Sequence, residues 1–255
     1  MKSRFIPFIA IALLLSACQI QVISTEPPSS PATQPPSGAS TDIVLDYAAL
    51  AQTVTLETVA AQPAGADSPW WGAAPQYRLL TLQAYPVTSH QSKPQIFIYP
   101  AGELASANEN MDKVAAQLQA LLQTQQAEVP LPFLPLINAQ QVIHLQLQNL
   151  DFKSGKGIRF LTMYSQGLVP VNNFELIYTF QGLTSNGKYY IAAVLPVTNP
   201  QLPNDPNINE QLTGVGIDYQ NYISQTASLL NEEPAGSFTP DLNKSDALIR
   251  SIDVK

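Results

Sequence analysis

Side chains that could perform chemistry are few and widely spaced in this chain of 255 residues. The chain has two histidines, His90 and His144, and one cysteine, Cys18. No two histidines have the spacing of a zinc site, and the chain has neither a Gly-x-Ser-x-Gly elbow nor a glycine-rich phosphate loop. His144 could turn toward Ser165 or Asp151 across a predicted hairpin and form a catalytic pair. The alternative is a partly exposed strand histidine with no catalytic role, and we expect no metal and no cofactor.

One run of polar residues resembles the first half of a calcium-binding loop. Residues 205–209, Asp-Pro-Asn-Ile-Asn, place oxygen ligands at three alternate positions. Glu210 stands where such a loop needs glycine, and Gly216 stands where it needs a bidentate carboxylate. We therefore interpret the run as a loop capped by asparagines.

Two predicted loops carry large apolar side chains. Trp70 and Trp71 lie between a proline and a glycine, and prolines keep residues 131–136, Leu-Pro-Phe-Leu-Pro-Leu, out of helix and sheet. Two interpretations stay open. Each loop either folds back over the edge of the sheet or forms an exposed apolar patch that binds a ligand or partner. The second interpretation selects six candidate binding residues: Trp70, Trp71, Phe133, Leu134, Tyr164 and Tyr178.

The first eighteen residues have the order of a bacterial export signal. Lys2 and Arg4 precede an apolar run over residues 5–15, which is too short to span a bilayer. The run ends in Leu15-Ser16-Ala17-Cys18, which resembles the lipobox of bacterial lipoproteins at all four positions. The resemblance implies that residues 1–17 are removed and that Cys18, then the amino terminus, carries a thioether-linked lipid.

A lipid anchor also accounts for the single cysteine. An exported chain with one thiol has no partner for an intramolecular disulfide, whereas acylation uses that thiol. Gln19 follows in place of aspartate, so the inner-membrane retention signal of diderm lipoproteins is absent. We expect a cell-envelope protein that is anchored in the cell membrane or the outer membrane and has an extracytoplasmic domain. The alternative is an ordinary secretory peptide with a chance cysteine.

Composition divides the remainder into a linker and one domain. Residues 18–42 are rich in Pro, Ser and Thr and poor in large apolar residues, which predicts a disordered spacer. Residues 43–255 are long enough to form one domain with its own core. The chain's net charge of −7 argues against nucleic acid as a partner.

Hydrophobic periodicity predicts more strands than helices. Alternation of period two marks early strands, and two later hairpins turn at residues 153–157 and at Thr184-Ser185-Asn186-Gly187. The fold class is therefore α+β, with a mainly antiparallel sheet of about six to eight strands and two or three helices packed on it. The expected strands are 43–47, 53–59, 77–85, 95–99, 141–152, 158–164, 174–180 and 189–195, and the expected helices are 108–122, 218–232 and 240–248.

The carboxyl-terminal Ile-x-x-Ile-x-Val stretch, residues 249–254, follows the last predicted helix. This order of elements resembles the PsbP-type sandwich of the oxygen-evolving complex. The resemblance rests on element order alone and implies no functional residue.

Three functions remain open for the domain. We expect a non-enzymatic module that binds an envelope protein, peptide or small ligand through its aromatic loops. The alternatives are a cell-envelope hydrolase without a recognisable motif and a structural or assembly lipoprotein.

Overall fold

The computed structural model describes residues 42–65, 68–205 and 218–255. They belong to one compact unit, from Ala39 to Lys255. This part of the chain contains four α-helices and nine strands, which confirms the predicted α+β class. Cys18 and most of the calcium-like run, residues 206–209, lie outside the described residues.

The elements follow the predicted order, with boundaries that mostly shift by a few residues. The strands are β1 (Ile43–Val44), β2 (Thr53–Val59), β3 (Tyr77–Gln83), β4 (Gln95–Pro100), β5 (Gln140–Phe152), β6 (Gly155–Ser165), β7 (Ile177–Thr184), β8 (Tyr189–Pro196) and β9 (Asp253–Val254). The helices are α1 (Leu104–Ala107), α2 (Glu109–Thr124), α3 (Tyr219–Glu232) and α4 (Leu242–Ser251), with short 3₁₀ turns η1 (Ala101–Glu103) and η3 (Ala235–Ser237).

Seven strands form one antiparallel sheet in the order β2-β3-β4-β8-β7-β6-β5. Two meanders, β2 to β4 and β5 to β8, meet where β4 pairs with β8. The four consecutive antiparallel strands predicted from the two hairpins are confirmed. β1 and β9 pair separately as a two-stranded ribbon.

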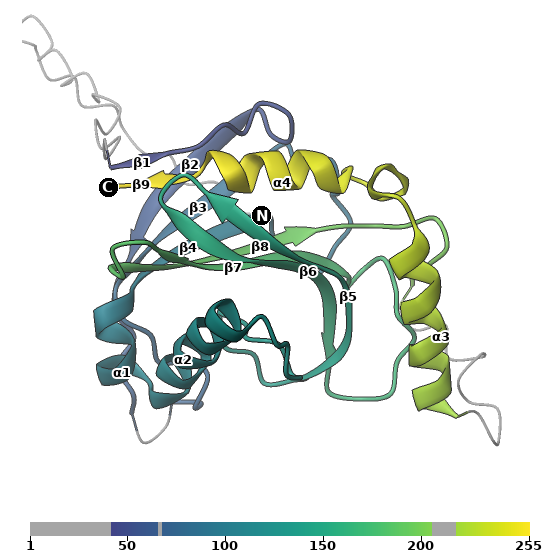
Figure 1. Cartoon of the computed structure of the whole chain (residues 1–255), viewed down its shortest axis with the longest axis horizontal. Helices are drawn as coiled ribbons and strands as arrows, with labels where there is room; N and C mark the ends of the chain where they lie inside the picture. Colours follow the sequence, from purple (N-terminus) through teal and green to yellow (C-terminus); the bar gives the residue numbers. More distant parts are fainter. Residues whose placement is uncertain (1–41, 66–67, 206–217) are drawn as a thin grey trace, which may run out of the picture. The chain divides into compact units, whose positions relative to one another are not determined.

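Helices cover both faces of the large sheet (Figure 1). α1 and α2 lie against one face, where Leu118 and Leu122 of α2 join a core with Phe160 of β6. α4 and the β1–β9 ribbon lie on the other face, where Leu248 of α4 joins a core with Phe180 of β7. Because both faces are covered, the side chains of β7 and β8 are buried almost without interruption.

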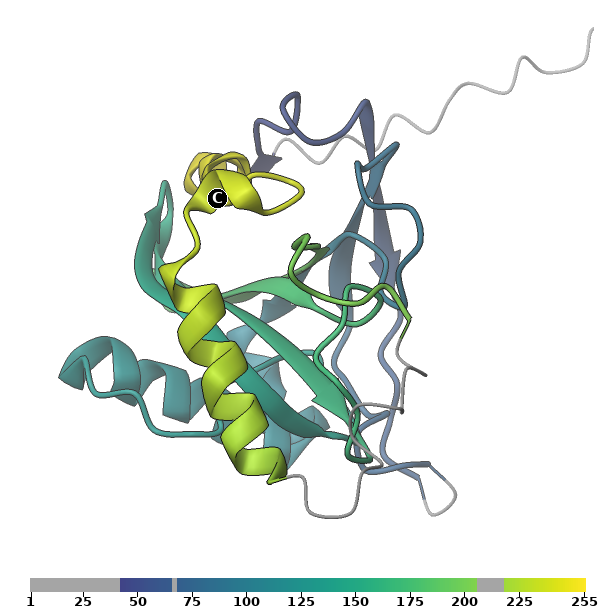
Figure 2. The same ribbon diagram turned by 90° about the vertical axis from the view of Figure 1, so that its right-hand side faces the viewer.

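The third long helix, α3, lies at one edge of the sheet, beside β5 (Figure 2). Its start is capped by Asp218, whose side chain accepts a hydrogen bond from the amide of Asn221. Asn108 caps α2 in the same way, by accepting from the amide of Asn110. Both caps satisfy amide groups that have no partner inside the helix.

The edge strand β5 contains an irregularity that changes which side chains face the core. Leu145 pairs with Leu161, whereas Gln148 pairs with Arg159, so one extra residue lies between these pairs. Gln146 takes a φ of 52°, as an inserted residue in a β-bulge can. Ile143 and Leu145 are buried, but the bulge reverses the two faces of the strand beyond them, so Leu147 is 42% exposed.

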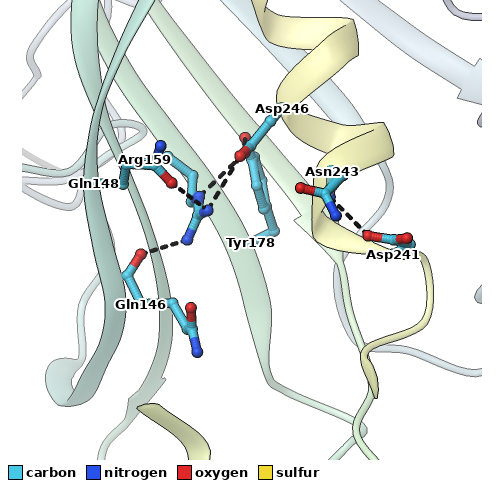
Figure 3. Close-up of polar contacts among 7 residues, drawn as sticks. All are labelled: Gln146, Gln148, Arg159, Tyr178, Asp241, Asn243 and Asp246. Carbon is cyan, nitrogen blue, oxygen red and sulfur yellow. Dashed lines mark hydrogen bonds and ion pairs between the residues drawn. The ribbon is translucent and has the colours of Figure 1, made fainter. Parts of the chain in front are cut away.

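A buried ion pair lies beside this bulge (Figure 3). The Nε and Nη2 atoms of Arg159 donate to the two carboxylate oxygens of Asp246 on α4, each at 3.1 Å. Arg159 also donates to the carbonyl oxygen of Gln146 and, at 2.7 Å, to Oε1 of Gln148. Tyr178 donates its hydroxyl to Asp246 at 2.8 Å. Burial, together with the Asp246 carboxylate, raises the pKa of Tyr178 well above its usual value, so this hydroxyl stays protonated.

The bulge also fixes the end of α3. The side-chain amide of Gln146 donates to the carbonyl oxygens of Leu230, Asn231 and Glu233. The backbone amide of Gln146 donates to Oδ1 of Asn231 at 2.7 Å. One residue of the sheet edge therefore bonds to several of the carbonyl groups that have no partner inside the helix where α3 ends.

We predict that Asp246→Asn destabilises the domain by about 3–5 kcal/mol, because it leaves the guanidinium of Arg159 buried without an opposite charge. Urea unfolding followed by circular dichroism measures this loss. Lys113→Ala is the control, because it removes the exposed Glu109–Lys113 pair within α2 and should cost only about 0.5 kcal/mol. Equal losses of unfolding free energy in the two variants would show that the buried ion pair matters no more to stability than the exposed one.

Candidate functional site

Two adjoining pockets lie where β5 begins and β6 ends. The larger has a volume of about 690 Å³ and contains Trp70 in its wall. The smaller, of about 460 Å³, contains Trp71. We call them the Trp70 pocket and the Trp71 pocket, and together the aromatic groove. The two pockets share Ile137, Asn138, Ala139, Ser165 and Gln166.

The two tryptophans project into solvent from the connection between β2 and β3. Trp70 is 51% exposed and Trp71 is 37% exposed. Their ring centroids are 5.7 Å apart, and the ring planes are at 85°, an edge-to-face arrangement. Of the two interpretations of this loop, the structure therefore supports the exposed patch.

Short-range contacts hold this tryptophan loop in place. A bridge between Gln62 and Ala74 closes its base with two backbone hydrogen bonds. The side-chain amide of Asn108 donates to the carbonyl oxygens of Trp70, at 2.7 Å, and Ala73, at 3.2 Å. Because the Oδ1 atom of Asn108 caps α2, one side chain joins the helix start to the loop.

A third aromatic residue, Tyr164, lines the Trp71 pocket. Its ring packs on that of Phe133, with centroids 4.6 Å apart, and its hydroxyl accepts a hydrogen bond from Gln141. Burial raises the pKa of Tyr164 above its usual value. The hydroxyl therefore stays protonated beside the side-chain amide of Gln141.

The first turns of α3 form the far wall of the Trp70 pocket, through Tyr219, Gln220 and Ile223. The hydroxyl of Tyr219 donates to the carbonyl oxygen of Val169, and the hydroxyl of Tyr222 accepts from the amide of Val171. These two bonds fasten the start of α3 to the segment that follows β6.

His90 holds the rim of the Trp71 pocket. Its Nδ1 accepts from the amide of Ser92, which lines the pocket, so Nε2 carries the proton and donates to the carbonyl oxygen of Leu176. Burial lowers the pKa of His90 below its usual value of 6.5. This neutral histidine has a positioning role and is not placed to exchange protons with a ligand.

The six predicted site residues do not form one surface. Trp70, Trp71 and Tyr164 come together at the groove, but Phe133 is 6% exposed and Leu134 is fully buried. The amide and carbonyl groups of Leu134 both bond to the side chain of Gln181 in β7. For residues 131–136 the folded-back interpretation is therefore correct, because Gln181 satisfies backbone groups that burial would otherwise leave unpaired.

Tyr178 is also no part of the groove. It is fully buried in the core shared with α4, whereas Phe133 lies in the core shared with α2. The two residues thus lie on opposite faces of the sheet. Phe133 contributes to the groove only by supporting the ring of Tyr164.

The catalytic pair considered for His144 is not formed. His144 is exposed on β5 and pairs with Thr162, whereas Ser165 pairs with Gln140 and Asp151 pairs with Lys156. Neither candidate stands opposite the histidine. No three His, Cys, Asp or Glu side chains within residues 42–65, 68–205 and 218–255 gather at a distance suited to a metal ion.

Several residues of the groove were not predicted from the sequence. Ile137 and Leu168 are 37% and 71% exposed, and Asn138, Gln140 and Gln166 are also exposed. Each is ordinary by itself in a surface loop or strand end. The pairing of Gln140 with Ser165 and the hydrogen bond from the side-chain amide of Gln166 to the carbonyl oxygen of Asn138 bring the two segments together.

Searches against protein-family models, curated proteins and solved structures returned no match to this chain. They lend no support to the resemblance to PsbP-type domains. No helix among the described residues has the length and apolar character needed to cross a bilayer.

We predict that Asn108→Asp frees the tryptophan loop without removing the cap of α2. A carboxylate still accepts from the amide of Asn110, but it cannot donate to the carbonyl groups of Trp70 and Ala73. The loss should be about 1–2 kcal/mol of stability for two partly exposed bonds, with lower fluorescence anisotropy of the tryptophans.

Asn108→Ala is the companion variant. It removes both bonds and the cap, so it should cost about 1 kcal/mol more than Asn108→Asp. Unchanged anisotropy in both variants would show that Asn108 does not hold the loop.

Proposed function

We propose that this chain is a lipid-anchored, extracytoplasmic envelope protein whose domain is a non-enzymatic binding module, with the aromatic groove as its binding site. The observation that carries the proposal is the exposed Trp70–Trp71 pair above two joined pockets. Tryptophan and tyrosine are the side chains most often responsible for binding energy in interfaces. Because the exposed indoles bury little surface in the fold, a partner that covers them gains free energy from burying that surface.

Rigidity of the groove supports the proposal. Asn108 fixes the tryptophan loop, Phe133 backs Tyr164, and two tyrosine hydroxyls fasten the start of α3. A surface that is already ordered loses less conformational entropy when it binds. The fixed loop thus favours recognition over a role as a flexible connector.

The chemistry of the lining supports binding without catalysis. Glu175 is the only charged residue among the described side chains that line the two pockets. Its carboxylate accepts from Asn172, and no histidine, cysteine or lysine lines the groove beside it. The described lining thus offers apolar contact and hydrogen bonding in place of a nucleophile with its base.

The position of the groove suits a tethered module. The described part begins at Asp42, whose carbonyl accepts from Lys255 beside the β1–β9 ribbon. Val254 of that ribbon donates to Ser154 in the turn between β5 and β6, whereas the groove lies where β5 begins, at Gln140. A strand of this length spans on the order of 40 Å. The groove therefore lies at the end of the hairpin remote from the point where the linker joins.

We predict that Trp70→Ala and Trp71→Ala each weaken binding of the natural partner at least tenfold, because truncating an aromatic anchor removes a large part of the contact energy. The partner would be isolated by its retention from fractionated envelope extract on the immobilised protein, and its affinity measured by calorimetry. Leu229→Ala is the matched control, since the exposure of Leu229, 47%, lies between those of the two tryptophans, but Leu229 is on α3 outside the lining of either pocket. Retention of every component by the double variant Trp70→Ala/Trp71→Ala would contradict the proposed site.

We predict that Cys18→Ser moves the protein from the membrane fraction to the soluble fraction of cells that produce the full chain. Serine cannot form the thioether that the lipobox resemblance implies, and stable anchoring needs two or more acyl chains. Immunoblots of both fractions, with Ser16→Ala as the control inside the same motif, measure the change. Equal membrane association of the wild type and Cys18→Ser would contradict lipid anchoring.

A further inference from the structure

The aromatic groove presents two rings to two adjoining spaces. Trp70 lines one pocket and Trp71 the other, and the pockets share five residues. The two rings are perpendicular and 5.7 Å apart between centroids. Neighbouring units of one linear molecule could therefore each contact one indole.

The polar part of the lining consists mainly of side-chain amides. Asn138, Gln140 and Gln220 line the Trp70 pocket and are exposed. Within the described part of the protein, these three side-chain amides form no hydrogen bond, so they can bond to a ligand. Each amide both donates and accepts, which suits a hydroxyl group that also does both.

Charge excludes several classes of ligand. The described lining contains no arginine or lysine, and the chain carries a net charge of −7. Nucleic acids and acidic polymers need cationic partners, and the carboxylate of Glu175 would repel them. An uncharged ligand meets neither obstacle, so the site suits it better than a polyanion.

Aromatic rings and amides together match the two surfaces of a sugar. A sugar ring has a face of C–H groups, which packs on an aromatic ring, and an edge of hydroxyl groups, which bonds to amides. An acyl chain would leave those amides unpaired, at a cost. Resting on the proposed binding function, we propose that the aromatic groove binds a neutral carbohydrate chain, with one sugar ring stacked on Trp70 and a neighbouring ring on Trp71.

The test uses the full chain, purified in a zwitterionic detergent that contains no sugar. Cellotetraose, laminaritetraose, mannotetraose and the tetramer of N-acetylglucosamine are titrated while tryptophan emission is recorded. Because Trp70 and Trp71 are the only tryptophans, the signal comes from the groove alone. At least one tetrasaccharide should shift the emission to the blue and bind at least tenfold more tightly than its monosaccharide.

Variants separate stacking from hydrogen bonding. Trp70→Ala and Trp71→Ala should each weaken that tetrasaccharide at least tenfold, with the remaining tryptophan as reporter. Gln140→Ala should weaken it several-fold, and Leu229→Ala should leave it unchanged. Equal binding by Trp70→Ala and the wild type would overturn the stacking arrangement.

Two further probes distinguish a groove that binds another kind of ligand from a groove that binds none. They are an acidic oligosaccharide, tetragalacturonate, and a proline-rich peptide with the sequence of residues 26–37. If no neutral tetrasaccharide shifts the emission while the peptide or an envelope fraction does, the carbohydrate inference is wrong and the binding function stands. If no probe and no envelope fraction changes the emission, both are wrong.

Discussion

The guanidinium of Arg159 and the carboxylate of Asp246 are buried together in the core, at 6% and 5% side-chain exposure. Removing two charges from water is costly, so such a pair persists only where further hydrogen bonds satisfy both groups. Here Tyr178, Gln148 and the carbonyl of Gln146 supply them. The ion pair thereby fixes how α4 lies on the sheet and holds the β5 bulge open beside Arg159.

The aromatic groove depends on this ion pair and the β5 bulge because they position α3. The bulge directs Gln146 to the end of that helix, and the start of the same helix forms one wall of the Trp70 pocket. The opposite wall is fixed separately, because Asn108 joins the tryptophan loop to α2. Tyr164, packed on Phe133, lines the Trp71 pocket. Different side chains thus fix the separate parts of the groove: Gln146 at the end of α3, and Asn108 at the tryptophan loop.

Local pattern predicts most of the fold. The hairpins, the positions of α2 and α3 and the order of elements follow from turn residues and hydrophobic spacing, which act over a few residues. The α+β class follows from the same elements. The exposure of Trp70 and Trp71 was one of two interpretations that the proline and glycine around them left open.

Long-range partners explain what the sequence could not predict. Leu134 is buried because Gln181, 47 residues away, bonds to its backbone. A glutamine in the middle of a strand rich in apolar residues is the signal that could have indicated such a partner. Leu147 is exposed because one inserted residue in β5 reverses its alternation. The groove itself depends on the pairing register of β5 and β6, which no local motif specifies.

The most direct test of the exposed aromatic groove is acrylamide quenching of tryptophan fluorescence in the unliganded full chain. Both tryptophans lie at the groove, so no other residue contributes to the signal. We expect red-shifted emission that acrylamide quenches readily, because 51% of Trp70 and 37% of Trp71 are open to solvent. Blue-shifted emission that resists acrylamide would place both indoles in the core and would contradict the binding groove.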